Sequence, residues 1–125
     1  MPKHNVKKSK LLRIKRKISI RKKLFGTSEI PRLSVYRSLK HIYAQVINDT
    51  DGKTLVSTST LQPEFISKKE KKIKKTKEAF LVGEILAKKC LKKKIDKICF
   101  DRNGFKYHGR IKALADGARK VGLKF

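Results

Sequence analysis

Residues 32–47 read RLSVYRSLKHIYAQVI, and this stretch decides the fold. Apolar and polar side chains alternate through both halves of it, with Leu33 and Val35 in the first half and Ile42 and Val46 in the second. A period of two is typical of a β-strand that buries one face. Only three residues separate the two runs, and this spacing predicts an antiparallel hairpin.

The chain beyond the hairpin continues in strand and helix patterns. The segment 48–52 is rich in residues that tolerate positive φ and predicts a turn, and residues 54–61 form a third strand pattern. Apolar spacing predicts helices over 76–91 and 109–121, with a strand at 95–101 between them. The predicted order β-β-β-α-β-α gives an α/β fold, a mixed sheet with helices packed on it. Its last strand lies parallel to the first, at the sheet centre.

Three local details make this prediction more specific. Residues 98–100 are continuously apolar, which indicates a strand buried on both faces. Gly83 interrupts a helix at a cost of about 1 kcal/mol relative to Ala, so we expect that helix to approach the sheet closely there. Gly122 stands where a helix C-cap glycine belongs.

The first part of the chain differs in composition and predicts a basic arm, 1–28, followed by one α/β domain, 29–125. The arm contains no acidic residue, and 11 of its first 23 residues are Lys or Arg. Because this charge outweighs the apolar area, we expect the arm to be disordered or frayed in the free protein. The spacing of Leu11, Ile14 and Ile18 allows it to fold as a helix on RNA; the alternative is a merely solubilising tail.

The charge of the whole chain points to a polyanionic partner. There are 35 Lys and Arg against 10 Asp and Glu, a formal net charge of +25. Self-repulsion at this density destabilises a compact chain on its own, and a polyanion relieves it. Nucleic acid is the commonest polyanion in cells. Its binding should weaken steeply as salt rises, because each neutralised phosphate releases counterions.

Residues 100–110, FDRNGFKYHGR, combine the features of an RNA contact. Their cations can hold phosphate, and their aromatic rings can stack on exposed bases. Glycines let the backbone approach a ligand closely, and the helix that follows offers free N–H groups to an anion. This mixture suits RNA better than it suits an enzyme pocket or a membrane.

The hairpin offers a second group of contacts. Cations, a serine and a histidine gather at its tip, and Tyr43 and Gln45 lie on the face opposite the apolar one. If no helix covers that face, it presents stacking and hydrogen-bonding groups beside the cations. Two plainer interpretations stay open: ordinary strand packing for the tyrosines and a solvated turn for the tip.

The predicted RNA-binding residues thus fall in three groups. Those in the arm are Lys7, Lys8, Lys10, Arg13, Lys15, Arg16, Lys17, Arg21 and Lys22. Those in the hairpin are Arg32, Arg37, Ser38, Lys40, His41, Tyr43 and Gln45. Those in the loop before the last helix are Arg102, Asn103, Phe105, Lys106, Tyr107, His108, Gly109 and Arg110.

No motif predicts catalysis, so we expect no enzyme, no catalytic residue, no metal, no cofactor and no small-molecule substrate. Two-metal chemistry needs several converging carboxylates, and Asp101 is the lone acid at the end of the last strand. We expect Asp101 and Asp116 to be salt-bridged. The spacing of Cys90 and Cys99 fits neither a metal site nor a disulfide framework, so both are predicted to fill the core.

The sequence contains no apolar run long enough to span a bilayer and no secretory leader, so we expect no membrane partner and a reducing cytosol or an organelle stroma. The alternative function is non-specific binding and compaction of duplex DNA. Proteins of that class usually show a basic ribbon tip or a recognition helix, and neither is visible here. Residues 68–77 hold seven lysines and allow two interpretations, a solvated helix start or a patch that faces phosphate.

Taken together, these segments resemble a known family. The chain is similar from end to end to the bacterial-type large-subunit ribosomal proteins numbered eighteen in the traditional scheme, which bind 5S rRNA. The segments that carry the resemblance are Pro31–Ser38, Lys40–Ile47, Gly52–Leu55, Val82–Glu84, Phe100–Arg102, Tyr107–Arg110, Lys112–Asp116 and Gly122–Phe125.

The resemblance implies a structural component of the ribosome with a translational-machinery fold, related to the ribonuclease-H-like topology. It implies partners, namely 5S rRNA, 23S rRNA and neighbouring proteins of the central protuberance, in a bacterial cytoplasm or an organelle. The RNA contacts would be the arm, the loop around 37–41 and the stretch 102–110. The family usually has Asn where this chain has Leu39, and often Gly at Asn103. Asn103 can adopt the left-handed conformation that keeps the loop shape.

Overall fold

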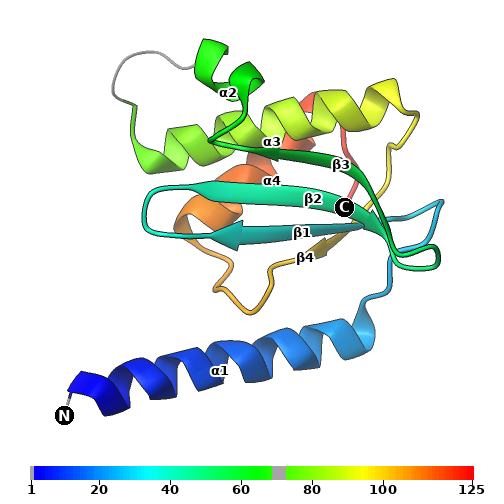
Figure 1. The fold of residues 1–125 in the computed structure, drawn as a ribbon. Helices are drawn as coiled ribbons and strands as arrows, with labels where there is room; N and C mark the ends of the chain where they lie inside the picture. The colour runs from blue at the N-terminus through cyan, green and yellow to red at the C-terminus, as the bar shows by residue number, and fades with distance from the viewer. Residues whose placement is uncertain (1, 69–72) are drawn as a thin grey trace.

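The computed structural model describes residues 2–68 and 73–125, with side chains for 8–67 and 73–125. Along the chain its elements are α1 (Pro2–Lys23), β1 (Arg32–Arg37), β2 (Ile42–Asn48), β3 (Lys53–Ser59), α2 (Pro63–Lys68), α3 (Lys75–Lys92), β4 (Cys99–Asp101) and α4 (Gly109–Val121) (Figure 1). The predicted α/β fold is confirmed, with one additional short helix, α2. The centre of the lysine-rich run, 69–72, lies outside the described residues.

The sheet has four strands in the order β3-β2-β1-β4. β1 and β2 form the predicted antiparallel hairpin, with Val35 opposite Ala44, and β3 continues the meander. β4 runs parallel to β1 as expected, but it lies at the edge of the sheet and not at its centre. The reason is that β1 and β3 already occupy both sides of β2, so the crossover through α3 adds its strand to the free edge of β1.

β4 is shorter and less buried than its apolar sequence predicts. It covers three residues, and Cys99 and Phe100 are only half-buried. The prediction of a strand buried on both faces is therefore wrong. The apolar character has another cause, because the ring of Phe100 stacks on that of Phe125 with centroids 5.6 Å apart. The C-terminal residue thus covers this side chain at the sheet edge.

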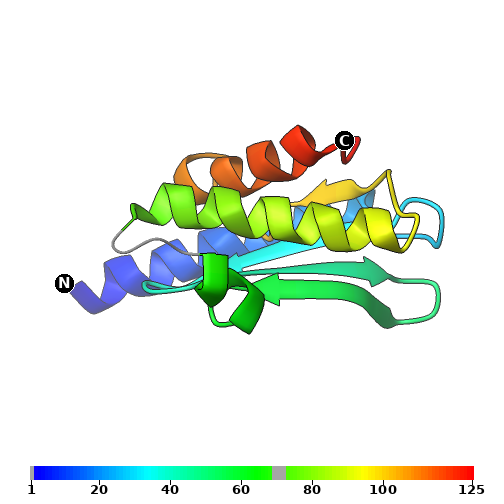
Figure 2. The same cartoon turned by 90° about the horizontal axis from the view of Figure 1, so that it is seen from above.

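α3 and α4 cover one face of the sheet, and the core lies between these two layers (Figure 2). The predicted apolar face of the hairpin is confirmed, since all its members are nearly or fully buried. The largest contributors to the core are Leu33, Val35, Ile42 and Val46 from the sheet, Val82 and Leu86 from α3, and Ile111 and Leu114 from α4. Gly122 ends α4 with φ 129°, as the sequence predicts.

α3 and α4 touch through a pair of glycines. A methyl group added at Gly83 would collide with the carbonyl oxygen of Leu114, and one at Gly117 would collide with the carbonyl oxygen of Phe80. The close approach predicted at Gly83 is real, but its partner is α4 and not the sheet. Because backbone meets backbone at both positions, no side chain fits there.

α1 is a continuous helix where the sequence predicts a disordered or frayed arm. It lies along the side of the sheet where β4 forms the edge (Figure 1). Its backbone comes so close to the domain that a methyl group at Gly104 would collide with the carbonyl oxygen of Arg13. The Arg13 guanidinium also lies 4.3 Å from the centre of the Phe105 ring. These contacts with a distant loop hold the helix, and no local pattern in the arm reveals them.

The side of α1 that contacts the domain is basic. Arg13 and Lys17 are half-buried. The apolar side chains that predicted the helix, Leu11, Ile14 and Ile18, are exposed at 57%, 46% and 53%. The arm therefore docks on the domain with cations among its contacts, the Arg13 guanidinium lying against the Phe105 ring.

α2 is a helix that the sequence patterns do not indicate. Pro63 marks the end of the third strand pattern, but proline is also favoured in the first turn of a helix. Phe65 of α2 is 1% exposed, and Glu64 pairs with Lys89 of α3. One buried ring and one ion pair thus anchor this short helix on α3.

Cys90 fills the core as predicted: it is fully buried, and burial raises the pKa of its thiol to about 11. Cys99 is half-buried in β4. Within the described ranges, no helix is long and apolar enough to cross a membrane. Over the same part of the chain, His, Cys, Asp and Glu side chains form no group of three or more that could hold a metal ion.

Candidate nucleic-acid interface

The sheet topology gathers two of the three predicted contact segments at one end of the molecule. Because β1 and β4 are parallel, the hairpin tip after β1 and the loop after β4 leave the sheet in the same direction. α3 and α4 both begin at this end (Figure 2). Lys75 at the start of α3 donates a hydrogen bond to the carbonyl of Leu39 at the hairpin tip. The candidate interface is therefore built from segments that are far apart in sequence.

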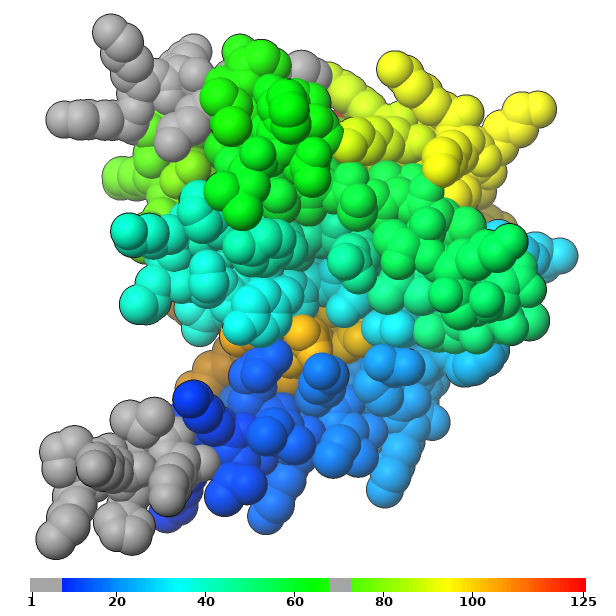
Figure 3. Space-filling view, viewed as in Figure 1, coloured from blue at the N-terminus to red at the C-terminus, as the bar shows by residue number. Residues whose placement is uncertain are grey.

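The sheet face opposite α3 and α4 is open and lies between α2 and α1 (Figure 3). Tyr36 is 46% exposed, Gln45 is exposed and Tyr43 is half-buried. With Ser34 and Asn103, among others, they line a hollow of about 450 Å³. The prediction that Tyr43 and Gln45 share the face opposite the apolar one is confirmed, and α3 and α4 lie on the other side of the sheet.

Tyr36 lies at the centre of an aromatic cluster on this face. Its ring centroid is 6.1 Å from that of Tyr43 and 5.8 Å from that of Phe105. The guanidinium of Arg13 lies 4.3 Å from the centre of the Phe105 ring, and that of Arg37 lies 5.2 Å from it. This interleaving of flat rings with cations is what single-stranded nucleic acid needs, since bases stack on the rings and phosphates pair with the charges.

The loop after β4 takes a defined shape. Asn103 and Gly104 have φ values of 55° and 78°, so Asn103 does adopt the left-handed conformation expected of it. The Asn103 N–H donates to Asp101 Oδ1 at 2.8 Å. Arg102 Nη1 donates to the carbonyl of Phe105 at 2.7 Å, which closes the loop. The loop thereby presents Phe105 to the aromatic cluster.

The hairpin tip is ordered by contacts with the rest of the domain. The Ser38 N–H donates to the carbonyl of His41 at 2.8 Å, and Arg110 Nη2 donates to the carbonyl of Ser38 at 2.7 Å. His41 Nδ1 lies 2.9 Å from Thr60 Oγ1. Lys40 remains exposed. The tip is therefore held by α4 and by Thr60, the residue after β3, and Lys40 faces solvent.

Arg32 is not available to RNA, contrary to the prediction. Its side chain is 6% exposed, and it donates from Nε to Asp49 at 2.9 Å and from Nη1 to Asp101 at 2.8 Å. A buried guanidinium needs such partners because an unpaired buried charge is very costly. The pairing holds the pKa of Asp49 down at about 2. It also confirms that Asp101 is salt-bridged.

Tyr107 belongs to a different cluster from the other predicted aromatics. Its hydroxyl accepts a hydrogen bond from Arg119 Nη1 at 2.7 Å, and its ring packs edge-on against Phe100 at 5.9 Å. Arg119 in turn lies 4.3 Å from the centre of the Phe125 ring. Tyr107 is 40% exposed, but its contacts with Arg119 and Phe100 keep it out of the aromatic cluster around Tyr36.

The predicted cations of the arm divide into two sets. Lys8, Lys10, Lys15, Arg21 and Lys22 are exposed, while Arg13, Arg16 and Lys17 are half-buried. The side chain of Lys7 lies outside the described part of the chain. In the last loop, Lys106 and His108 are exposed, and Gly109 and Arg110 are half-buried at the start of α4.

Two residues belong to this interface that were not among the predicted contacts. Tyr36 could have been found from the sequence, because the alternation that buries Leu33 and Val35 places it on the open face with Tyr43. Thr76 lines a hollow with Arg37 and Arg110. No local signal marks Thr76, since only the fold brings the start of α3 to the start of α4.

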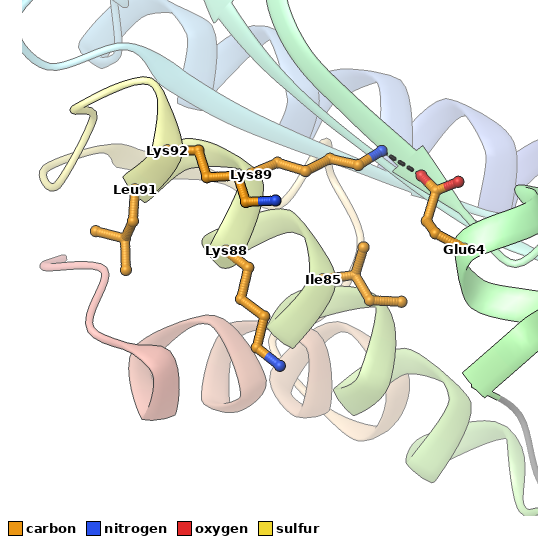
Figure 4. A pocket seen from close by; sticks show the side chains of 6 residues that line it. All are labelled: Glu64, Ile85, Lys88, Lys89, Leu91 and Lys92. Carbon is orange, nitrogen blue, oxygen red and sulfur yellow. Dashed lines mark hydrogen bonds and ion pairs between the residues drawn. The ribbon is translucent and has the colours of Figure 1, made fainter.

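A further hollow, of about 520 Å³, lies between α2 and α3, away from the aromatic face (Figure 4). It is lined by Glu64, Ile85, Lys88, Lys89, Leu91 and Lys92. Lys89 reaches across to the Glu64 carboxylate and also donates to the carbonyl of Ser57 at 3.0 Å. The ion pair between Lys89 and Glu64 lies in this hollow and joins α2 to α3.

Comparison with known proteins relates this chain to one family of ribosomal proteins. The family model for ribosomal L18 of archaea, bacteria, mitochondria and chloroplasts matches residues 7–125. The large ribosomal subunit protein uL18 of Pseudothermotoga lettingae is 59% identical over 93% of this chain and 94% of its own length. The uL18 protein of Aquifex aeolicus is 56% identical over 100% of this chain and 100% of its own length. That of Dictyoglomus thermophilum is 57% identical over 93% of this chain and 94% of its own length. A match of this extent, on a basic α/β domain with an open aromatic face, shows that the chain belongs to the ribosomal L18 family, the uL18 proteins of the large ribosomal subunit.

Proposed function

We propose that this protein binds 5S rRNA and helps to attach it to 23S rRNA in the central protuberance of the bacterial ribosome. The observation that carries the proposal is the open sheet face, where the ring of Tyr36 lies 6.1 Å from that of Tyr43 and 5.8 Å from that of Phe105, beside arginines. Membership of a large-subunit protein family supports an rRNA partner, and the sequence resemblance supports 5S rRNA in particular. The role is structural and needs no catalytic group.

The domain acts as a rigid platform in this mechanism. Arg37 and Lys40 at the hairpin tip, and Lys106 in the last loop, pair with phosphates and set the register of the RNA. Unpaired or splayed bases stack on the rings of the aromatic cluster. Contacts to 2′-hydroxyl groups in the hollow near Gln45 distinguish RNA from DNA, because the 2′-hydroxyl both donates and accepts hydrogen bonds.

The arm, 1–28, provides a second contact outside the domain. Its exposed cations, such as Lys15 and Lys22, lie on a helix that already projects beside the open face. A basic helix beside a stacking platform allows the protein to contact two RNA segments at once. This arrangement fits a protein that joins one rRNA to another.

The proposal is tested by measuring the affinity of the purified protein for 5S rRNA, for an unrelated structured RNA of equal length and for duplex DNA. We expect the tightest binding to 5S rRNA. Replacing Arg37 by Ala should weaken it about 10- to 100-fold, since a hydrogen bond to a charged group contributes about 1.5–3 kcal/mol.

Lys53→Ala is the matched control. Lys53 is an exposed cation at the start of β3, at the end of the sheet away from the hairpin tip. Circular dichroism shows whether each variant folds. Equal affinity for duplex DNA and 5S rRNA would favour the compaction of DNA instead.

A further inference from the structure

A cationic hollow separate from the aromatic face lies where α3 and α4 begin. It has a volume of about 340 Å³ and is lined by Arg37, Thr76, Lys106, His108, Gly109 and Arg110. We propose that this hollow is a dedicated seat for one backbone phosphate of the bound RNA, held between the hairpin tip and the starts of the two helices. The inference rests on the proposed function and assigns one contact within it.

The charges around the hollow favour an anion. Arg37, Lys106 and Arg110 are all positively charged at neutral pH. No Asp or Glu lines the hollow within the described part of the chain. Burial lowers the pKa of Arg110, and the neighbouring Arg37 lowers it further; the carboxylate of Glu78 acts in the opposite direction as the smallest of the three causes. The free protein therefore holds these cations together against their repulsion, and a bound phosphate relieves it.

The position of Arg110 is fixed before any ligand arrives. Its Nη2 donates to the carbonyl of Ser38 at 2.7 Å, which ties the guanidinium to the hairpin tip. A guanidinium has five N–H donors, so others remain for an anion. Because the group is already oriented, little conformational entropy is lost when a phosphate binds.

The start of α4 adds donors to this arrangement. His108 is the N-cap residue, and its side chain makes no capping hydrogen bond. The first turn of α4 contains no acidic residue. Backbone N–H groups at such a helix start favour an anion, and here they support the side-chain cations.

The lining also selects phosphate over a base. Among the described residues, no Phe or Tyr side chain lines it, whereas the hollow on the open face is lined by Tyr36 and Tyr43. The structure thus separates two tasks, stacking on the sheet and phosphate binding at the helix starts. Arg37 is shared, since it lies both in this hollow and 5.2 Å from the centre of the Phe105 ring.

The first experiment titrates inorganic phosphate into the labelled full-length protein and follows the amide resonances by NMR. We expect saturable shifts centred on Gly109, Arg110 and Arg37. Lys106→Gln should weaken this binding about 10- to 100-fold, as loss of one charged hydrogen bond implies. Arg110→Gln should do the same.

Two features of the variants separate a loss of phosphate binding from a loss of folding or of charge in general. Lys106 is exposed, so its replacement is not expected to disturb folding even if the Arg110 variant opens the hairpin tip. Lys112→Gln is the matched control, because Lys112 is an exposed cation on α4, the helix that carries Arg110, and does not line the hollow. Shifts spread evenly over the lysines, or equal effects of the Lys106 and Lys112 variants, would overturn the site.

The second experiment maps which ethylated phosphates of 5S rRNA prevent binding. Interference at one phosphate, or at two neighbours, should disappear selectively with Lys106→Gln and persist with Lys112→Gln. An unchanged map would overturn the assignment to an RNA phosphate even if inorganic phosphate binds. Failure of 5S rRNA to bind at all, with saturable phosphate binding intact, would instead reject the proposed function and leave the anion site standing.

Discussion

At the scale of single residues, the position of carboxylates decides what each arginine does. Arg32 lies between Asp49 and Asp101, so its charge is used inside the fold. Arg37 and Arg110 lie at a hollow that no acid lines within the described part of the chain, so no lining carboxylate neutralises their charge there. Arginine thus serves the fold at position 32 and, under the proposal above, phosphate binding at positions 37 and 110.

The Asp49–Arg32 pair makes the stability of the fold depend on pH. The pKa of Asp49 falls from its ordinary 3.8 to about 2, chiefly because Arg32 donates hydrogen bonds to it. Because the pKa of Asp49 is lower in the folded protein than in the unfolded chain, its ionised form stabilises the fold at any pH above about 4, the unfolded pKa. This stabilisation is lost as the pH falls from about 4 to about 2. It amounts to about 2 kcal/mol.

We therefore expect Asp49→Asn to lower the free energy of unfolding by about 2 kcal/mol or more at pH 7, measured with urea. The gap to the unmodified protein should narrow between about pH 4 and about pH 2. Asp116→Asn is the control, since Asp116 is 45% exposed and its cationic partners lie 4.0 Å away. A gap that stays constant over this range would show that Asp49 is not the group responsible.

At the scale of elements, the contact between α3 and α4 sets the geometry of the proposed site. The two helices run side by side with their starts at the same end, and the Gly83 and Gly117 contacts fix their separation (Figure 2). The hollow between Thr76 and Arg110 exists because the helices begin together. A change at the crossing should therefore affect stability first and the phosphate seat second.

Gly83→Ala tests this crossing. Alanine has the better helix propensity by about 1 kcal/mol, yet its methyl group meets the backbone of Leu114 and forces the helices apart. We expect a net loss of about 1–3 kcal/mol in the free energy of unfolding, as for other overpacked cores. Lys88→Ala on the exposed side of the same helix should change stability little. If the Gly83→Ala variant is as stable as the original protein, α3 and α4 can move apart at this contact without loss of stability, and the prediction is wrong.

At the scale of the whole molecule, the net charge of +25 opposes folding and favours binding. A protein that makes about 6–10 phosphate contacts loses roughly 10³–10⁵ in affinity between about 50 and 200 mM salt. The slope of log affinity against log salt reflects the number of phosphates that the protein neutralises. α1 carries many of the cations that are available for this.

Deletion of residues 1–24 should weaken 5S rRNA binding and flatten its dependence on salt, measured by filter binding from about 50 to 200 mM NaCl. The physical reason is that the deleted segment holds 11 Lys and Arg, and fewer phosphates are neutralised without it. Circular dichroism of the shortened protein provides the control for folding. If the slope of log affinity against log salt is unchanged, the arm does not touch the RNA.

Much of the fold was predictable, because period and spacing are local properties. The hairpin, the last two helices and the Gly122 cap follow from side-chain alternation and from where glycines stand. The open face with Tyr43 and Gln45 was also predictable, since it is the opposite side of the same alternation. The candidate contacts of the hairpin and last loop could be chosen by chemistry alone.

The errors share one cause, which is that they depend on which distant segments meet. β4 at the sheet edge, α4 as the partner of Gly83 and the ordered α1 all follow from long-range packing. The removal of Arg32 from the interface follows from Asp49 and Asp101, which lie 17 and 69 positions further along the chain.

By itself, the sequence determined the strands of the sheet, the helices α3 and α4 with their approximate bounds, and the overwhelming positive charge, because these depend only on neighbouring residues or on a sum over the chain. Tertiary structure alone decided which cations are paired inside the fold and which converge on an open hollow. Pairing depends on distances between residues far apart in the chain, and those distances come into existence only when the sheet and helices pack.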